Sequence, residues 1–165
     1  MLNNKNWLLV FFIFSGCATI APSEIKQCGF LAEQQIFFCS HLSNGKIFYR
    51  GQMQYIDNTY YKNGFGEEYF KDGSIYRGGW KMGQRSGEGV YIVKDQTKCL
   101  SKWVDDRQVG KVICIYTGDY EGHIRQGLTN GTGGWLNRTL YIFPDGQTVE
   151  ESWQGGKIIE QKIIQ

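Results

Sequence analysis

The stretch Asp72–Tyr91, DGSIYRGGWKMGQRSGEGVY, holds the pattern that decides the fold. Aromatic residues and glycines alternate in both of its halves, at Tyr76, Gly78 and Trp80 and again at Gly87, Gly89 and Tyr91. Side chains at alternate positions of a strand share one face, and Gly83 between the halves suits the positive φ of a tight turn. The stretch therefore predicts a β-hairpin whose rings lie over bare glycine backbone of the neighbouring strand.

The composition fits short strands joined by tight turns. The chain has 165 residues, with 22 glycines, 2 prolines and 15% aromatic residues, whereas flexible linkers and disordered tails are poor in aromatics. The formal net charge of +2 comes without a basic block or an acidic tail. We therefore expect one folded domain and no nucleic-acid partner.

The hairpin pattern returns along the chain with a period near 23 residues. One step carries Trp80 onto Trp103 and Gly87 onto Gly110. Other units are placed by their landmarks: Tyr49, Gly51 and Met53 open an earlier one, Tyr116, Gly118 and Tyr120 open a later one, and Trp153 lies in the last. Because a single hairpin is marginal in water, the units must stack on one another.

This pattern, Y-x-G-x-W-x-x-G-x-x-x-G-x-G followed by D-G, resembles the MORN repeat family over roughly residues 49–156. The resemblance implies that each repeat is a hairpin. We therefore expect an all-β fold, an elongated single-layer antiparallel sheet of stacked β-hairpin (MORN-type) repeats over residues 34–165. The apolar segment 157–165, with its interspersed charges, would form an edge strand or a short cap.

The N-terminus carries a different signal. Lys5 precedes the apolar run Trp7–Phe14, which is too short to span a bilayer and is followed by small residues, as in a signal peptide. The segment Phe14-Ser15-Gly16-Cys17 resembles the lipobox of bacterial lipoproteins. We expect a signal peptide over residues 1–16, lipidation at Cys17, and a tether with an N-terminal segment over residues 17–33. The alternative is an ordinary cleaved signal peptide with an incidental cysteine.

The lipobox resemblance implies a multiply acylated Cys17, with palmitate among the chains, and several buried chains make a membrane anchor durable. Ala18 follows the cysteine, where an aspartate would indicate retention in the inner membrane. We therefore expect a bacterial cell-envelope protein that its N-terminal lipid anchors to a membrane, with the outer membrane favoured.

The other four cysteines form an even set, as disulfides in an oxidising compartment require. We favour the pairs Cys28–Cys39 and Cys99–Cys114, because each pair is close in sequence and the second would face across a hairpin. Buried free thiols are the alternative. A zinc site is not expected, since no C-x-x-C pair exists and His41 and His123 are far apart in sequence.

No catalytic set of residues stands out, and we expect neither enzymatic activity nor a cofactor. The adjacent acid pairs Glu67-Glu68, Asp105-Asp106 and Glu150-Glu151 would point to opposite sheet faces and lie in solvent. Both histidines are expected at the surface. An enzyme of unknown type is the weakest of our hypotheses.

These observations favour a scaffold or protein-interaction module with an envelope protein as its partner. The alternative is direct binding of membrane lipid headgroups or cell-wall glycan. The aromatics at repeat positions are expected to pack in the core, whereas Trp135 falls in an insertion near residues 129–135 and is the better candidate for an exposed contact. The basic residues Arg77, Lys81 and Arg85 of the strongest repeat are further candidates for a binding surface.

Overall fold

The computed structural model describes residues 25–31, 36–43, 45–94 and 97–165, so Cys17 and the expected signal peptide lie outside the described residues. The described chain forms twelve strands: β1 (Ile25–Leu31), β2 (Ile36–Ser43), β3 (Lys46–Ile56), β4 (Thr59–Tyr69), β5 (Ile75–Lys81), β6 (Gln84–Val93), β7 (Thr97–Val104), β8 (Arg107–Tyr116), β9 (Ile124–Thr129), β10 (Trp135–Ile142), β11 (Thr148–Gln154) and β12 (Lys157–Ile163).

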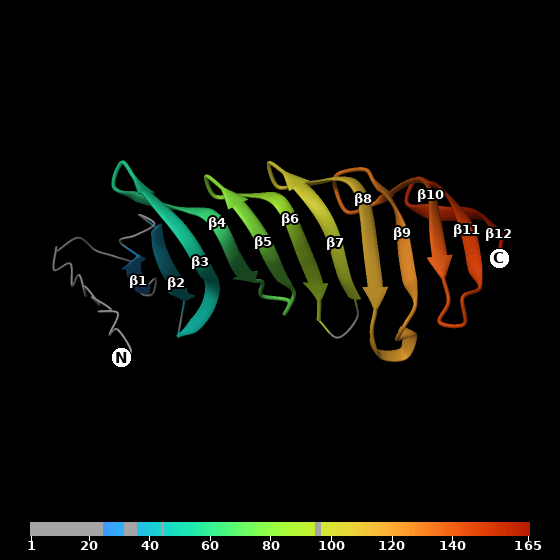
Figure 1. Cartoon of the computed structure of the whole chain (residues 1–165), viewed down its shortest axis with the longest axis horizontal. Helices are drawn as coiled ribbons and strands as arrows, with labels where there is room; N and C mark the ends of the chain where they lie inside the picture. The colour runs from blue at the N-terminus through green and yellow to red at the C-terminus, as the bar shows by residue number, and fades with distance from the viewer. Residues whose placement is uncertain (1–24, 32–35, 44, 95–96) are drawn as a thin grey trace, which may run out of the picture.

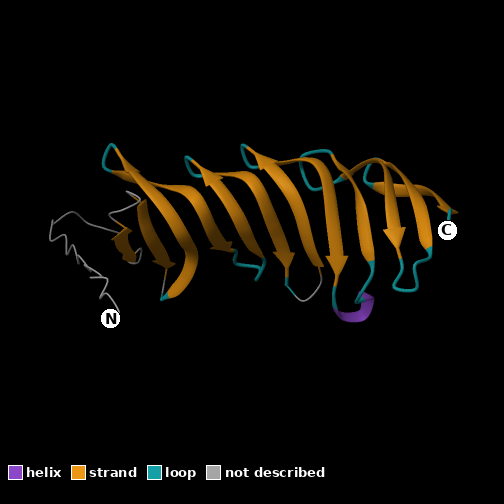
Figure 2. Cartoon of the chain, viewed as in Figure 1, coloured by secondary structure: helices purple, strands orange, loops and turns teal. Residues whose placement is uncertain are grey.

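These strands build one antiparallel sheet in which the spatial order is the sequence order, β1 to β12 (Figure 1). Most of the described residues lie in strands, and a single 3₁₀ turn among them, η1 (Gly118–Tyr120), lies between β8 and β9 (Figure 2). No helix among the described residues is long and apolar enough to cross a membrane. The expected all-β fold, one elongated sheet of consecutive hairpins, is confirmed.

The sheet begins earlier in the sequence than expected. β1 lies within residues 17–33, which we assigned to a tether and N-terminal segment, yet all seven of its residues pair with β2. The physical reason is the pairing of Cys28 with Cys39, which are directly opposite in register and joined by a disulfide. At the other end, the segment that was expected as an edge strand or a cap is the edge strand β12.

One face of the sheet, here called the aromatic face, holds the core. Tyr49 and Tyr76 are fully buried and Trp80 and Trp103 are 5% exposed, although the sheet has a single layer. The rings meet edge to face: Tyr76 lies 5.2 Å from both tryptophans, and Tyr49 lies 5.6 Å from Trp80, measured between ring centroids. The cores of neighbouring hairpins are therefore continuous.

The tyrosine rings lie flat against the sheet because the residues beneath them are glycines. Gly78 pairs with Gly66 on one side and with Gly89 on the other, and all three share the aromatic face. A Cβ atom at Gly89 would lie 2.5 Å from Tyr76 Oη and 2.7 Å from its Cζ. Each buried hydroxyl still has an acceptor, since Tyr76 Oη donates to Gly79 O at 3.0 Å and Tyr49 Oη donates to Gln52 O at 2.9 Å.

The opposite face, here called the aliphatic face, carries two rows of aliphatic side chains between β5 and β10. Residues that pair across neighbouring strands share a face, and the rows follow from that register. The first row contains Val90, Leu100, Ile113 and Leu140, with Gln126 between the last two. The second contains Ile75, Ile92, Ile115, Ile124 and Ile142, with Lys98 between Ile92 and Ile115. Leu100 is 44% exposed and Ile115 is 39% exposed, so this face differs sharply from the buried aromatic face.

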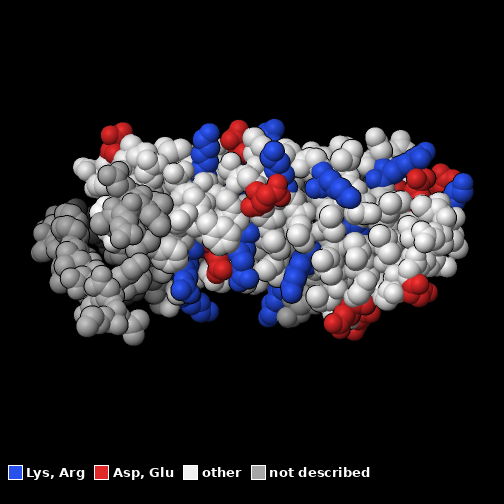
Figure 3. Space-filling view, in the orientation of Figure 1, with Lys and Arg blue, Asp and Glu red and all other residues white. Residues whose placement is uncertain are grey.

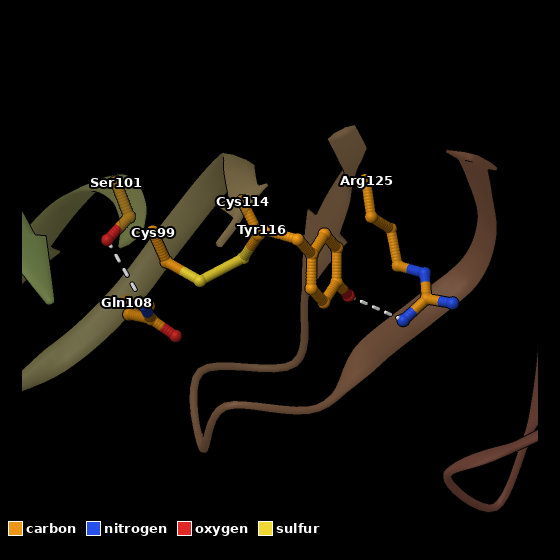
Figure 4. The surroundings of a disulfide bond; sticks show 6 residues. All are labelled: Cys99, Ser101, Gln108, Cys114, Tyr116 and Arg125. Atoms are coloured by element: carbon orange, nitrogen blue, oxygen red, sulfur yellow. Dashed lines mark hydrogen bonds between the residues drawn. A yellow bond between two sulfur atoms is a disulfide. The ribbon is translucent and has the colours of Figure 1, made fainter. Parts of the chain in front are cut away.

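Both expected disulfides are present. Cys28 is bonded to Cys39, and Cys99 to Cys114, with each pair directly opposite across a hairpin. Figure 4 shows Cys99–Cys114 on the same strands as Ser101 and Gln108. Cys99 takes the repeat position of Tyr76, because it pairs with Tyr91 as Tyr76 pairs with Glu68. A covalent bond therefore stands where the strongest repeat has a buried ring.

We predict that Gly89→Ala destabilises the protein by about 1–3 kcal/mol, because the added methyl group collides with the ring of Tyr76. Urea unfolding followed by circular dichroism measures the effect. Gly29→Ala is the matched control: Gly29 is also a strand glycine, and a Cβ atom there meets nothing within 4 Å. Equal stability of the two variants would contradict the role assigned to the glycines.

We predict that replacing Cys99 and Cys114 together by serine lowers the free energy of unfolding by roughly 3 kcal/mol, given a sequence separation of 15 residues. Urea unfolding of both proteins, with and without reductant, measures the loss. Reductant should then change the variant only through Cys28–Cys39. We call the units opened by Tyr49 and Tyr76 the first and second repeats, and the unit of β7 and β8 with Cys99, Trp103 and Cys114 the third repeat. An undiminished stability of the double variant would show that this bond contributes nothing to the third repeat.

Candidate binding surface

Three cations lie over rings on the aromatic face, and they repeat along the sheet. Lys62 lies over Tyr49 and Trp80, Arg85 lies over Tyr76 and Trp103, and Arg125 lies over Tyr116, Tyr141 and Trp153. Each cation also forms an ion pair, so its charge is matched where it leaves bulk water. We refer to these three groups as the cation–ring clusters.

The first two clusters are one repeat apart. Lys62 Nζ lies 4.3 Å from the centroid of Trp80 and pairs with Glu68, and the guanidinium carbon of Arg85 lies 4.2 Å from the centroid of Trp103. Arg85 Nε donates to Asp106 Oδ1 at 2.9 Å, and the backbone N–H of Arg85 donates to the same oxygen at 2.9 Å. Rings that would otherwise face solvent are thus covered by paired cations.

The third cluster is built around a buried acid. Glu151 is 1% exposed and accepts hydrogen bonds from Arg125 Nε at 2.9 Å and Arg125 Nη2 at 3.2 Å. Thr139 Oγ1 donates to Glu151 at 2.7 Å and itself accepts from Trp153 Nε1 at 2.8 Å. Arg125 Nη1 also donates to Tyr116 Oη at 2.8 Å. This network links β8, β9, β10 and β11.

Burial shapes the ionisation of the groups beneath the cations. Desolvation raises the pKa of Tyr76 to about 12, against an opposing effect of Arg85, and it raises the pKa of Tyr49 further, with help from Glu68. Desolvation works against the charged form of Asp106, but hydrogen bonds from Arg85 and its positive charge lower the pKa of this carboxyl overall. The tyrosines therefore stay neutral and Asp106 stays charged near neutral pH.

The three basic candidates do not form one patch. Arg85 lies on the aromatic face and is engaged by Asp106, whereas Arg77 pairs with Val90 in register and belongs to the aliphatic face together with Lys81. Arg77 Nε lies 2.7 Å from Glu67 Oε1, and both Arg77 and Lys81 are exposed. Of the three, only Arg77 and Lys81 offer charge to a ligand of the aliphatic face.

Trp135, the candidate for an exposed contact in the insertion, lies in the sheet and not in the loop. It opens β10, pairs with Thr129 and is half-buried. The insertion itself closes between these two residues, where Asn130 N donates to Gly134 O at 2.9 Å. Strand pairing at the base of the loop therefore draws the tryptophan into the sheet.

The histidines and one acid also differ from expectation. His41 was expected at the surface but is only 8% exposed, because it packs edge to face with Phe48 and Tyr49. His123 is half-buried, and its Nδ1 lies 2.9 Å from Tyr141 Oη. Glu151 was expected in solvent but is buried by Arg125. The expected separation of adjacent acids onto opposite faces does hold for Glu67 and Glu68, which pair with Arg77 and Tyr76.

Sequence reasoning did not find Lys62 or Arg125, although both carry a cation–ring cluster. A signal existed for Lys62, since it precedes Arg85 by one repeat period. Arg125 takes the repeat position of Tyr76, so the repeat pattern hides its role. Among the residues that the structure describes, no three histidine, cysteine, aspartate or glutamate side chains gather as a metal site.

The comparisons with known proteins leave the family open. No family model matches the chain. A stretch of 60 residues, 36% of the chain, is 32% identical to the inactive protein tyrosine kinase pTKL of Plasmodium falciparum (isolate 3D7), and this match covers 4% of that protein. The shared stretch is similar to a small part of a much longer protein, whose activity does not transfer to this chain.

We predict that Arg125→Leu destabilises the protein by about 3–5 kcal/mol, because the charge of Glu151 is left buried without its partner. Adding Glu151→Leu should recover much of this loss, since no buried charge then remains. Urea unfolding at neutral pH of both single variants and the double variant gives the coupling energy. Arg138→Leu is the control, because Arg138 is 70% exposed beside Glu150 and should cost about 1 kcal/mol or less. Equal costs for Arg125→Leu and Arg138→Leu would contradict the buried network.

Proposed function

We propose that the chain is a MORN-type, lipid-anchored protein of the bacterial cell envelope that acts without catalysis, as a scaffold or protein-interaction module. The observation that carries this proposal is the aliphatic face of the sheet. Its two rows of aliphatic side chains lie in one layer with exposed members at Leu100 and Ile115. Exposed apolar side chains that gather on one face of a domain commonly mark an interaction site, and here Lys98 and Gln126 lie among them.

The geometry divides stability and interaction between the two faces. Around the first two cation–ring clusters, the aromatic face is covered by its own rings and paired cations. The aliphatic face adds little to this core and is left for a partner. Two disulfides support a location in an oxidising compartment, in agreement with the lipobox resemblance at Cys17.

A second candidate function is binding of membrane lipid headgroups or cell-wall glycan by the aliphatic face. It is favoured by Arg77 and Lys81, which are exposed on that face beside the aliphatic rows. Figure 3 shows lysine and arginine side chains spread along the length of the molecule, with acidic side chains between them. Binding to an anionic bilayer would therefore be weak and sensitive to salt.

We predict that a photocrosslinking amino acid at Leu100 of the full-length chain, expressed in bacteria, captures one recurring envelope protein. Ile115→Glu should abolish the capture, because it places a charge in the apolar contact, whereas Asp145→Lys in an exposed turn should leave it intact. Crosslinks to phospholipid or peptidoglycan, lost with Arg77→Glu and Lys81→Glu, would favour the second candidate. If neither a protein crosslink lost with Ile115→Glu nor a lipid or glycan crosslink lost with the charge reversals is obtained, both proposed functions are wrong.

The anchor is tested in the same cells. Wild-type protein should partition into the detergent phase of solubilised envelopes, and Cys17→Ser should move it to the aqueous phase. Intact mass of the purified protein would show the acyl chains directly. An unmodified Cys17 would contradict the lipid anchor while leaving the interaction surface untouched.

A further inference from the structure

A hollow of about 280 Å³ interrupts the aromatic face beside the third repeat. It lies between the second cation–ring cluster and the loop that joins β9 to β10. Its lining consists of Arg85, Tyr91, Trp103, Asp106, Gln108, Gly131, Thr132 and Gly133. The hollow is at the lower limit of small-molecule pockets, so it suits a single ring system rather than a larger ligand.

The third repeat lacks a ring that the preceding repeat packs against its tryptophans. Tyr76 meets Trp80 and Trp103 edge to face, each at 5.2 Å between centroids. One repeat later its position is taken by Cys99, which is small and turned into a disulfide. Among the residues that the structure describes, Tyr76 is the only ring that meets Trp103 edge to face.

A second ring is missing from the next strand. Trp80 pairs with Gly64 and Trp103 pairs with Gly87, two glycines with positive φ. The corresponding glycine of the third repeat is Gly110, and the residue that falls opposite it is Thr129, since Leu128 pairs with Lys111. A threonine thus stands where two preceding repeats have a tryptophan.

The polar groups around the hollow also differ from those of the preceding repeats. Gln108 stands at the repeat position of Lys62 and Arg85, and its amide donates to Ser101 Oγ at 3.1 Å instead of covering two rings (Figure 4). Trp103 Nε1 is buried without an acceptor among the described residues, whereas Trp80 Nε1 donates to Gly66 O at 3.3 Å.

The walls of the hollow are held in place. Asn130 Oδ1 accepts hydrogen bonds from Thr132 N at 2.9 Å and Gly134 N at 3.0 Å, which fixes the loop over Gln108. On the other side, Tyr91 Oη lies 2.9 Å from Ser74 Oγ. The charge of Arg85 is matched by Asp106, so an anion gains little here. A flat, neutral ring is the ligand that these walls fit.

We propose that the hollow receives an aromatic side chain, tryptophan or tyrosine, of a partner polypeptide. The inserted ring would meet Trp103 as Tyr76 does and would stack near Arg85, which completes the third repeat. Aromatic anchors in pre-formed pockets dominate the affinity of many protein interfaces. This inference rests on the proposed interaction function, and it adds a second contact point on the aromatic face.

The test uses the full-length chain in detergent micelles with N-acetyl-L-tryptophanamide as the probe, followed by nuclear magnetic resonance. The probe should shift the side-chain amide signal of Gln108 and the indole signal of Trp103. N-Acetylglucosamine, the sugar probe, should shift neither. No shifts from the tryptophan probe, or shifts from the sugar alone, would overturn the inference.

Filling the hollow from within provides the matched variants. Thr129→Trp restores the repeat residue and should weaken probe binding by about tenfold or more. Thr129→Ser keeps the hydroxyl that accepts from Gly131 N and adds no bulk, so it should bind as wild type. Because Thr129 Oγ1 accepts a hydrogen bond from Gly131 N, Gln108→Phe serves as a second filling variant on another strand. Unchanged probe binding in both filled variants, each folded by circular dichroism, would overturn the location.

In cells, a photocrosslinker at the exposed Thr132 should capture a protein, and Thr129→Trp should remove that product. Capture through Leu100 without any probe binding would overturn the hollow as a ring site and leave the proposed function standing. Probe binding without a captured protein at Leu100 or Thr132 would support the ring site and overturn the proposed function.

Discussion

The contact between tyrosine rings and glycine backbone is the constraint on which the structure depends. A sheet of one layer has no second layer to bury its apolar side chains, yet Tyr49 and Tyr76 are completely buried. They reach this state by lying along their own sheet, over the positions of Gly66, Gly78 and Gly89. Glycine weakens a strand, and this cost is offset only when a ring packs over it. Because the rings of one hairpin pack over glycines of the next, each hairpin depends on its neighbours for stability.

The cations take the place of the missing layer. Lys62, Arg85 and Arg125 lay their flat or extended side chains across rings that a globular protein would cover with another sheet or a helix. Each is neutralised by an acid, which limits the cost of its partial burial. In the third cluster the acid itself is buried, and this end of the sheet is fastened by a polar network instead of a row of glycines.

Period and alternation in the sequence were enough to predict the class of fold and the consecutive hairpins, and the close spacing of the cysteines predicted both disulfides. They fail where tertiary pairing overrides local pattern. Residues 17–33 were assigned to a tether and N-terminal segment outside the sheet, but Ile25–Leu31 within them form a strand by pairing with β2. His41 was misplaced for a related reason, since its burial depends on the rings of Phe48 and Tyr49 on the neighbouring strand. The hollow was not predicted from the sequence, because it depends on rings that are missing at the repeat positions of Cys99 and Thr129.

The division between regular and irregular repeats carries the functional argument. In the second repeat, the ring of Tyr76 covers Gly78 and Gly89 and meets Trp103 of the next unit edge to face. In the third, the Cys99–Cys114 bond joins β7 to β8 without filling volume, so the repeat can lose its ring and remain folded. The covalent bond can hold the two strands together where no buried ring packs between them. The disulfide explains how the third repeat can lack the buried ring that the other repeats need for stability. We place the partner's aromatic side chain in this third repeat.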